Sequence, residues 1–278
     1  IHNGQGPQPF FWRAPTDNDY GAKLPTRLKA WREASYQTPK AESFNVSKDG
    51  DKSIVKVTYR FPQVDAQWEI TYKVFANGII KVDNRFVAEG TETPMIPRVG
   101  LRMQLSEILN DLTYYGRGPE ENYRDRRTSQ FIGEYTTPIK DLYEPYIRPQ
   151  ENEHRTDIYW CALTTKQKAG LLFIADRTFE LNASNYLLGS LDSGETIDNG
   201  APRTNETNHR HLTDPQPVKQ VDMFIDYRMM GVGGDNSWGA IAHEPYLIRP
   251  GVENAIEYGF SIVPFDKKAD YKNLIYQY

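Results

Sequence analysis

The sequence has a single cysteine, Cys161, among 278 residues. One thiol excludes a disulfide within the chain and a zinc site built from cysteines. No apolar run approaches the ~18 residues of a membrane-spanning helix, and no segment has the form of a secretory signal, although a signal removed upstream would leave no trace. The chain begins at Ile1, which indicates a processed chain or an excised piece. We therefore expect a soluble protein with no membrane partner, and both the cytoplasm and the periplasm stay open.

An excess of positive charge is also lacking. The net charge is −4, and residues of both signs are spread along the chain, so there is no basic patch of the kind that binds nucleic acid. The sequence contains no phosphate-binding Gly-rich motif ahead of a helix and no Gly-x-Ser-x-Gly nucleophile turn. These absences argue against nucleotide-binding α/β enzymes and serine hydrolases of the α/β class.

Aromatic residues and period-two alternation are plentiful. The chain has 18 Tyr, 12 Phe and 5 Trp, which suit half-buried strands. The pattern predicts one short helix over 26–34, a loop over 1–22, a two-residue hairpin turn at Asn77-Gly78, and strands over 53–61, 68–74, 79–86, 94–105, 170–176, 221–230 and 255–265. We therefore expect an all-β protein, a large antiparallel β-sandwich with few short helices, in a single domain spanning residues 1–278.

A glycine-rich stretch, Gly231–Gly239, follows the predicted strand at 221–230 and contains Trp238. Glycines permit backbone angles that other residues reach only at a cost, and Asp235, Asn236 and Ser237 can hydrogen-bond to nearby N–H groups. A tryptophan on such a turn could offer its face to a sugar. It could equally fill the core beneath the turn, and the stretch alone leaves both interpretations open.

Three other polar groups have weaker functional interpretations. Asp17 and Asp19 suggest a calcium loop, but no glycine and later glutamate complete the pattern. His209 and His211 would share a strand face, yet no third metal ligand stands near them. The segment 117–127 holds four arginines and three acids, which could clamp an anion or form a salt-bridged loop. We expect the structural alternative in each case, and no metal site in this chain.

Five ordered motifs together carry a more specific signal: Arg13-Ala14-Pro15-Thr16-Asp17-Asn18-Asp19, Gly116-Arg117-Gly118-Pro119-Glu120-Glu121-Asn122-Tyr123-Arg124-Asp125-Arg126, Pro149-Gln150-Glu151-Asn152, His209-Arg210-His211-Leu212 and Gly231-Val232-Gly233-Gly234-Asp235-Asn236-Ser237-Trp238. In this order they resemble the C-terminal small-chain domain of the large bacterial β-galactosidases of glycoside hydrolase family 2. The resemblance covers essentially the whole chain.

The resemblance implies a β-supersandwich related in fold to galactose mutarotases. It implies that the parent enzyme is a retaining β-galactosidase, and a homo-oligomer. The catalytic glutamates and the magnesium and sodium sites would then lie on a barrel domain outside this chain. No catalytic residue and no cofactor is expected here, and the barrel domain and a β-galactoside or other carbohydrate are the expected partners.

The resemblance also assigns Trp238 to substrate binding at the mouth of the active site. Asp17, Asn18, Asp19, Gly21, Asp235, Asn236 and Ser237 are then supporting loop residues, with Gly21 a candidate hinge because glycine moves freely through positive φ. Mutarotase catalysis does not carry over, because kinship of fold does not transfer function. An autonomous carbohydrate-binding or mutarotase-like module remains the alternative to an accessory domain of β-galactosidase. The natural glycoside and linkage stay open.

Overall fold

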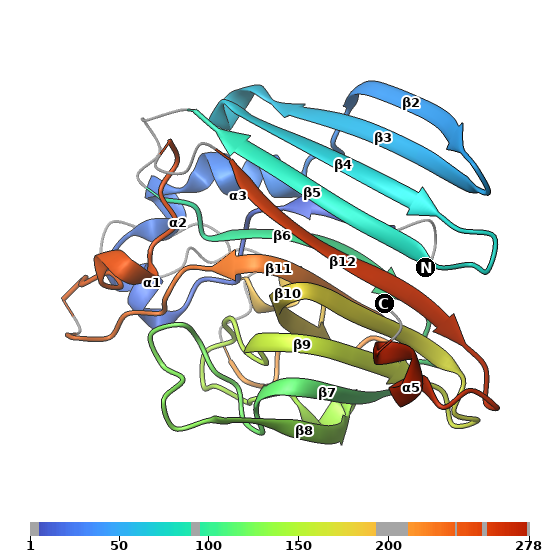
Figure 1. The fold of residues 1–278 in the computed structure, drawn as a ribbon. Coiled ribbons are helices and arrows are strands. Elements are labelled where there is room, and N and C mark those ends of the chain that lie inside the picture. The colour runs from blue at the N-terminus through green and yellow to red at the C-terminus, as the bar shows by residue number, and fades with distance from the viewer. Residues whose placement is uncertain (1–5, 90–94, 193–210, 237, 252–254, 277–278) are drawn as a thin grey trace.

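The computed structural model describes residues 6–89, 95–192, 211–236, 238–251 and 255–276. Antiparallel strands dominate it (Figure 1). The strands are β1 (Gln8–Phe10), β2 (Ala41–Asp49), β3 (Lys52–Phe61), β4 (Ala66–Val74), β5 (Ile80–Ala88), β6 (Arg98–Leu105), β7 (Asp111–Gly118), β8 (Phe131–Pro138), β9 (Arg155–Thr164), β10 (Gly170–Ser184), β11 (Val221–Met229) and β12 (Ile256–Phe265). The helices are α1 (Asp17–Gly21), α2 (Leu24–Arg27), α3 (Lys29–Tyr36), α4 (Leu188–Leu191) and α5 (Tyr271–Ile275), with single 3₁₀ turns at Pro62–Val64, Ile139–Asp141 and Glu244–Tyr246.

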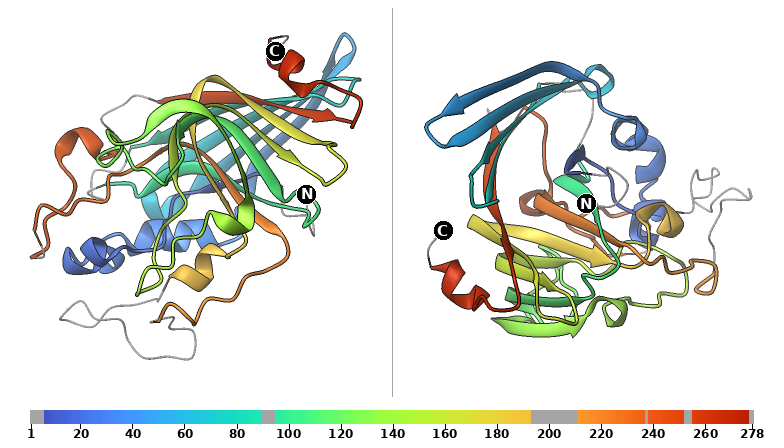
Figure 2. Two further views of the ribbon diagram at one scale, coloured as in Figure 1. Left: turned by 90° about the horizontal axis from the view of Figure 1, so that it is seen from below. Right: turned by 90° about the vertical axis from the view of Figure 1, so that its right-hand side faces the viewer.

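The strands form one sheet in the order β1-β6-β11-β10-β12-β5-β4-β3-β2, and β9, β7 and β8 continue it from β10. Every strand pair is antiparallel. Figure 2 shows that the sheet is strongly curled, as the twist of a sheet with this many strands favours. The expected all-β supersandwich with few short helices is confirmed.

An aromatic cluster attaches the N-terminal segment to the sheet. Phe11 lies 5.2 Å from Trp31 of α3, 5.5 Å from Trp68 of β4 and 5.4 Å from Phe86 of β5 between ring centroids. All four rings are buried, and each such residue removes a large apolar area from water. Phe11 precedes α1 along the chain, and Trp31 follows α2. Because both rings are held in this cluster, the cluster determines where α1 and α2 lie.

Three local predictions were wrong. The single helix expected over 26–34 is divided at Leu28 into α2 and α3. The segment 1–22 is not a continuous loop, because Thr16 caps a short helix, α1, with a reciprocal bond to Asp19. The connection at Asn77-Gly78 is longer than two residues. The Phe75 N–H donates to the Ile79 carbonyl, and Gly78, with a φ of 85°, closes a turn on the Phe75 carbonyl. That geometry belongs to a three-residue hairpin loop with glycine in the left-handed position.

Strands β7 and β8 were not anticipated because β7 contains Gly116 and Gly118 among charged residues. Contact with β9 explains Gly116, and contact with Tyr114 of β7 and Tyr135 of β8 explains Gly118. A Cβ on Gly116 would lie 2.4 Å from Ile158 Cδ1, and one on Gly118 would lie 2.2 Å from the Tyr114 hydroxyl. Close approach of neighbouring groups, rather than a turn, therefore requires glycine inside this strand.

Candidate functional site

The glycine-rich stretch leaves β11 and is tied at its start to the segment between β7 and β8. The backbone N–H groups of Val232 and Gly233 donate to the two carboxylate oxygens of Asp125, at 3.0 and 2.8 Å. A Cβ on Gly231 would lie 2.5 Å from the Asp125 carboxylate and 2.9 Å from Ala242. Gly231 is therefore required by close packing, and Asp125 fixes the direction in which the loop leaves the sheet.

A buried ion pair ties the same point to the N-terminal segment. Arg13 donates to both oxygens of Asp19, at 3.0 and 2.8 Å, and to the carbonyls of Met230 and Gly231, at 2.7 and 3.1 Å. Both side chains are almost completely buried. Burial by itself lowers the pKa of Arg13, but the charge and hydrogen bonds of Asp19 together with the charge of Glu151 outweigh that effect and raise the pKa. A planar guanidinium with four acceptors holds α1 against the end of β11 in one orientation.

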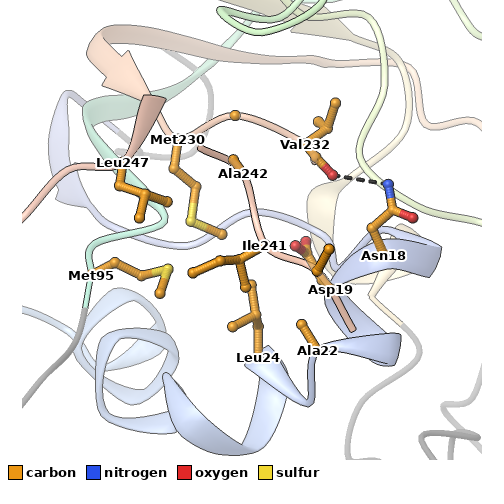
Figure 3. A pocket seen from close by; sticks show the side chains of 12 residues that line it. Asn18, Asp19, Ala22, Leu24, Met95, Met230, Val232, Ile241, Ala242 and Leu247 are labelled. Carbon is orange, nitrogen blue, oxygen red and sulfur yellow. Dashed lines mark hydrogen bonds between the residues drawn. The ribbon is translucent and has the colours of Figure 1, made fainter. Parts of the chain in front are cut away.

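Helix α1 makes two further contacts with the loop. The Asn18 side-chain amide donates to the Val232 carbonyl at 3.0 Å (Figure 3). Gly239, with a φ of 97°, packs so closely that a Cβ would lie 2.9 Å from the Gly21 carbonyl oxygen. Gly21 itself ends α1 in helical conformation and is not among the glycines with positive φ. The assignment of Gly21 as a hinge therefore stays a prediction.

The space between the loop and α1 and α2 is filled by apolar side chains (Figure 3). Leu24, Met95, Met230, Ile241 and Leu247 point toward one another there, and the free volume is about 0 Å³. A ligand cannot enter beneath the loop. Any contact with a ligand must use its outer surface.

Trp238 lies on that outer surface with 92 % of its area exposed. The structure thus excludes the core-filling interpretation. Its backbone N–H donates to Asn236 Oδ1 at 2.8 Å, a short side-chain turn, and Asp235 forms an ion pair with His243 across the loop. That pair raises the pKa of His243. Ser237 lies outside the described residues.

Buried polar side chains connect a further motif to this region. Glu151 accepts hydrogen bonds from the Ala14 N–H at 3.1 Å and from Arg98 at 3.0 Å. Glu180 accepts the Met229 N–H at 2.7 Å and is paired with Arg124 at 3.2 Å and with His154 at 3.0 Å. Burial by itself raises the pKa of Glu180, but these hydrogen bonds and ion pairs outweigh it and lower the pKa. Four of the five sequence motifs thus converge around the start of the loop.

The other polar groups have structural partners. The arginines of 117–127 are paired with acids: Arg117 and Arg127 with Asp157, Arg124 with Glu180, and Arg126 with Glu121. Asp17 contacts Arg148 and Gln150. His209 lies outside the described residues, and the backbone N–H of His211 donates to Asp214. Among the residues that the structure describes, no group of three or more potential ligands is placed to hold a metal.

Sequence reasoning missed the roles of Arg13, Asp125 and His243. Arg13 and Asp125 were visible as charged residues inside the motifs, but the loop residues that they bind are more than 100 positions away along the chain. His243 follows the loop and has no pattern around it that would mark it.

Among the residues that the structure describes, no helix is long and apolar enough to cross a membrane.

A family model described as "Beta galactosidase small chain" matches residues 1–262. The β-galactosidase of Priestia megaterium is 33 % identical over 243 residues, covering 87 % of this chain and 22 % of that protein. The β-galactosidase of Streptococcus thermophilus is 31 % identical over 248 residues, covering 88 % of this chain and 22 % of that protein. The chain therefore belongs to the β-galactosidase small-chain family, and it spans about a fifth of the length of these relatives.

Solved structures with a similar course of the chain include a sugar epimerase and a homologue of such an enzyme. The GalM/aldose epimerase homologue from C. elegans has a TM-score of 0.40 at 11 % identity, covering 80 % of this chain and 68 % of that one. The galactose 1-epimerase from Lactobacillus acidophilus NCFM has a TM-score of 0.41 at 7 % identity, covering 81 % and 66 %.

Proposed function

We propose that this chain is the small-chain domain of a retaining β-galactosidase, and that Trp238 forms part of the mouth of the active site. The family membership and the fifth of the relatives' length that the chain spans support an accessory rather than a catalytic role. The catalytic glutamates and the magnesium and sodium sites are assigned to the remainder of such an enzyme. Asp17, Asn18, Asp19, Gly21, Asp235, Asn236 and Ser237 are assigned to supporting that mouth.

The observation that carries the proposal is a fully exposed indole on a rigidly anchored loop. Exposing a tryptophan forgoes the stabilisation of burying it, about 3–5 kcal/mol for a core site. The loop beneath it is nonetheless fixed by Arg13, Asn18 and Asp125. An anchored aromatic face turned outward suits stacking against the apolar C–H face of a sugar.

Replacing Trp238 by alanine in the whole enzyme tests this proposal. A sugar that covers about 60–80 Å² of the indole gains roughly 1.5–2 kcal/mol at ~25 cal/mol per Å². Trp238→Ala should therefore weaken binding of a disaccharide or acceptor sugar by roughly ten- to thirty-fold. The effect should be smaller for substrates with small leaving groups, because the contact is assigned to the mouth.

Thermal unfolding of the same variant is the control. A side chain that is 92 % exposed should leave the melting temperature nearly unchanged. Unchanged disaccharide affinity in the folded variant would remove the assignment of Trp238 to substrate binding.

A further inference from the structure

A hollow with a volume of about 900 Å³ opens on a part of the sheet away from the loop that bears Trp238. It is lined by side chains from β4, β5, β9, β10, β11 and β12, including Asp157, Arg177, Arg228 and Tyr258. None of the described residues of the Gly231–Gly239 loop lines it. We call this hollow the sheet cleft.

The backbone is irregular in three adjacent strands where they border the sheet cleft. The register between β10 and β9 shifts between Ile174 and Phe179, and that between β11 and β6 shifts between Asp226 and Arg228. Asp157 of β9 has a φ of 56°, which is strained for a residue with a side chain. Bulges and strained residues cluster where a fold redirects side chains toward a ligand.

The two bulged segments are neighbours. Glu180 of β10 pairs with Asp226 of β11 in an antiparallel register, so the residues just before Glu180 lie beside those just after Asp226. Arg177 comes from the first segment and Arg228 from the second, and both line the sheet cleft. The bulges therefore bring two guanidinium groups from separate strands to one hollow.

These two arginines differ from the other charged residues of the cleft. Arg85 is paired with Glu69 and Glu257, Arg124 with Glu180, and Asp176 with Lys81. Among the described residues, by contrast, no carboxylate pairs with Arg177 or Arg228, and the Arg228 guanidinium lies 4.8 Å from the centre of the Tyr227 ring. Within that part of the chain, the cleft thus offers two cationic donors without a counter-charge.

We propose that the sheet cleft binds a small polyhydroxylated anion, a sugar acid, whose carboxylate is held by Arg177 and Arg228. Planar guanidinium groups bind carboxylates through paired hydrogen bonds. The neighbouring carboxylates of Asp176 and Glu257 accept hydrogen bonds from hydroxyl groups, and they disfavour a compact, multiply charged anion such as inorganic phosphate. The half-buried Tyr227 side chain, which lies beside the Arg228 guanidinium, supplies apolar surface for a ring.

Titration calorimetry with D-galacturonate and D-galactose tests the proposal, because the two sugars differ only in the carboxylate. The protein should bind D-galacturonate at least ten-fold more tightly than D-galactose, and the preference should shrink as salt is added. Arg177→Ala and Arg228→Ala should each weaken D-galacturonate binding by about ten-fold. Arg228→Lys should recover only part of the loss, because an ammonium lacks the planar fork.

Two variants serve as controls. Arg60→Ala removes an exposed arginine that is already paired with Asp65 and should leave D-galacturonate binding unchanged. Trp238→Ala should also leave it unchanged, so that failure of the loop assignment and failure of the cleft assignment are distinguishable. Equal affinity for the two sugars, or undiminished D-galacturonate binding by both arginine variants while their melting temperatures stay normal, would overturn the proposal. No detectable D-galacturonate binding at millimolar concentration would overturn it as well.

Discussion

Arg13 and Asp19 form a buried ion pair on which the position of α1 depends, and its loss can be predicted. Asp19→Asn leaves the Arg13 charge buried without a counter-charge. Breaking one side of a buried pair costs about 3–5 kcal/mol. Urea unfolding should show a loss of that size.

The matched change is Asp17→Asn, two positions earlier in the same helix. The Asp17 side chain is 64 % exposed, so this variant should change the free energy of unfolding by less than about 0.5 kcal/mol. Similar losses in the two variants would show that the Arg13–Asp19 pair does not hold the segment.

Glu153 makes the stability of the protein depend on pH. Burial raises the pKa of Glu153 to about 8, although Ser184 and Arg155 oppose the shift, and Glu153 Oε1 has no hydrogen-bond partner within the described chain. The unfolded chain loses this proton near pH ~4.3. Between the two values the folded state binds more protons, so its stability falls as pH rises, by up to ~1.4 kcal/mol per pH unit.

Glu153→Gln tests that dependence because glutamine resembles the protonated acid. Denaturant unfolding from pH 5 to 8 should show a flatter pH dependence in the variant and greater stability than the wild type at pH 8. Part of the slope should remain up to about pH 7, because burial also raises the pKa of Asp226 to about 7. A variant with the slope of the wild type would place the titrating group elsewhere.

At the scale of elements, the loop that bears Trp238 depends on Gly239. Alanine there would face a φ of 97° and a Cβ placed 2.9 Å from the Gly21 carbonyl oxygen, a strain of about 1–3 kcal/mol. Since Gly239 directly follows Trp238, Gly239→Ala should shift the indole and reduce disaccharide binding in the whole enzyme about as much as Trp238→Ala does.

Gly189→Ala is the control for this loop prediction. Gly189 lies in α4, and a Cβ there would meet nothing within 4 Å, so the substitution should leave both binding and melting temperature unchanged or raise the latter slightly. Normal disaccharide binding by Gly239→Ala would mean that the loop tolerates movement at this position.

The elements differ in how visible they were in the sequence. Strands β3, β4, β5 and β12 were anticipated within about two residues, because apolar residues recur at every second position over most of each strand. β10 is longer than expected because Asp176, Arg177 and Thr178, where the apolar pattern stops, form its bulge at the sheet cleft. The polar residues at this point mark a bulge within the strand and not its end.

At the scale of the whole molecule, we predict that the isolated 278-residue chain does not hydrolyse β-galactosides. Retaining hydrolysis needs two carboxyl groups about 5–5.5 Å apart across the scissile bond, and the proposed function places that pair in the remainder of the enzyme. A chromogenic β-galactoside, incubated with chain purified from a host without its own β-galactosidase, should give no turnover. Turnover in proportion to the amount of chain would contradict the accessory role.

The sequence by itself determined the all-β class, most strands and the family, because alternation and motif order are local or linear properties. It also marked Trp238, since few stretches place a tryptophan among so many glycines. The sequence left the orientation of Trp238 undecided. Exposure depends on whether other segments fill the space beneath the loop, and two of those segments, around Leu24 and Met95, are distant in sequence.

Only the tertiary structure decided which charged residues support the loop and which line the sheet cleft. Arg13 meets Gly231 across 218 positions, and Asp125 meets Val232 across 107. No local pattern encodes such pairs, because each depends on the curl of the sheet bringing distant strand ends together. The pairing of β10 with β11 and the bulges in these two strands place Arg177 and Arg228 beside one hollow.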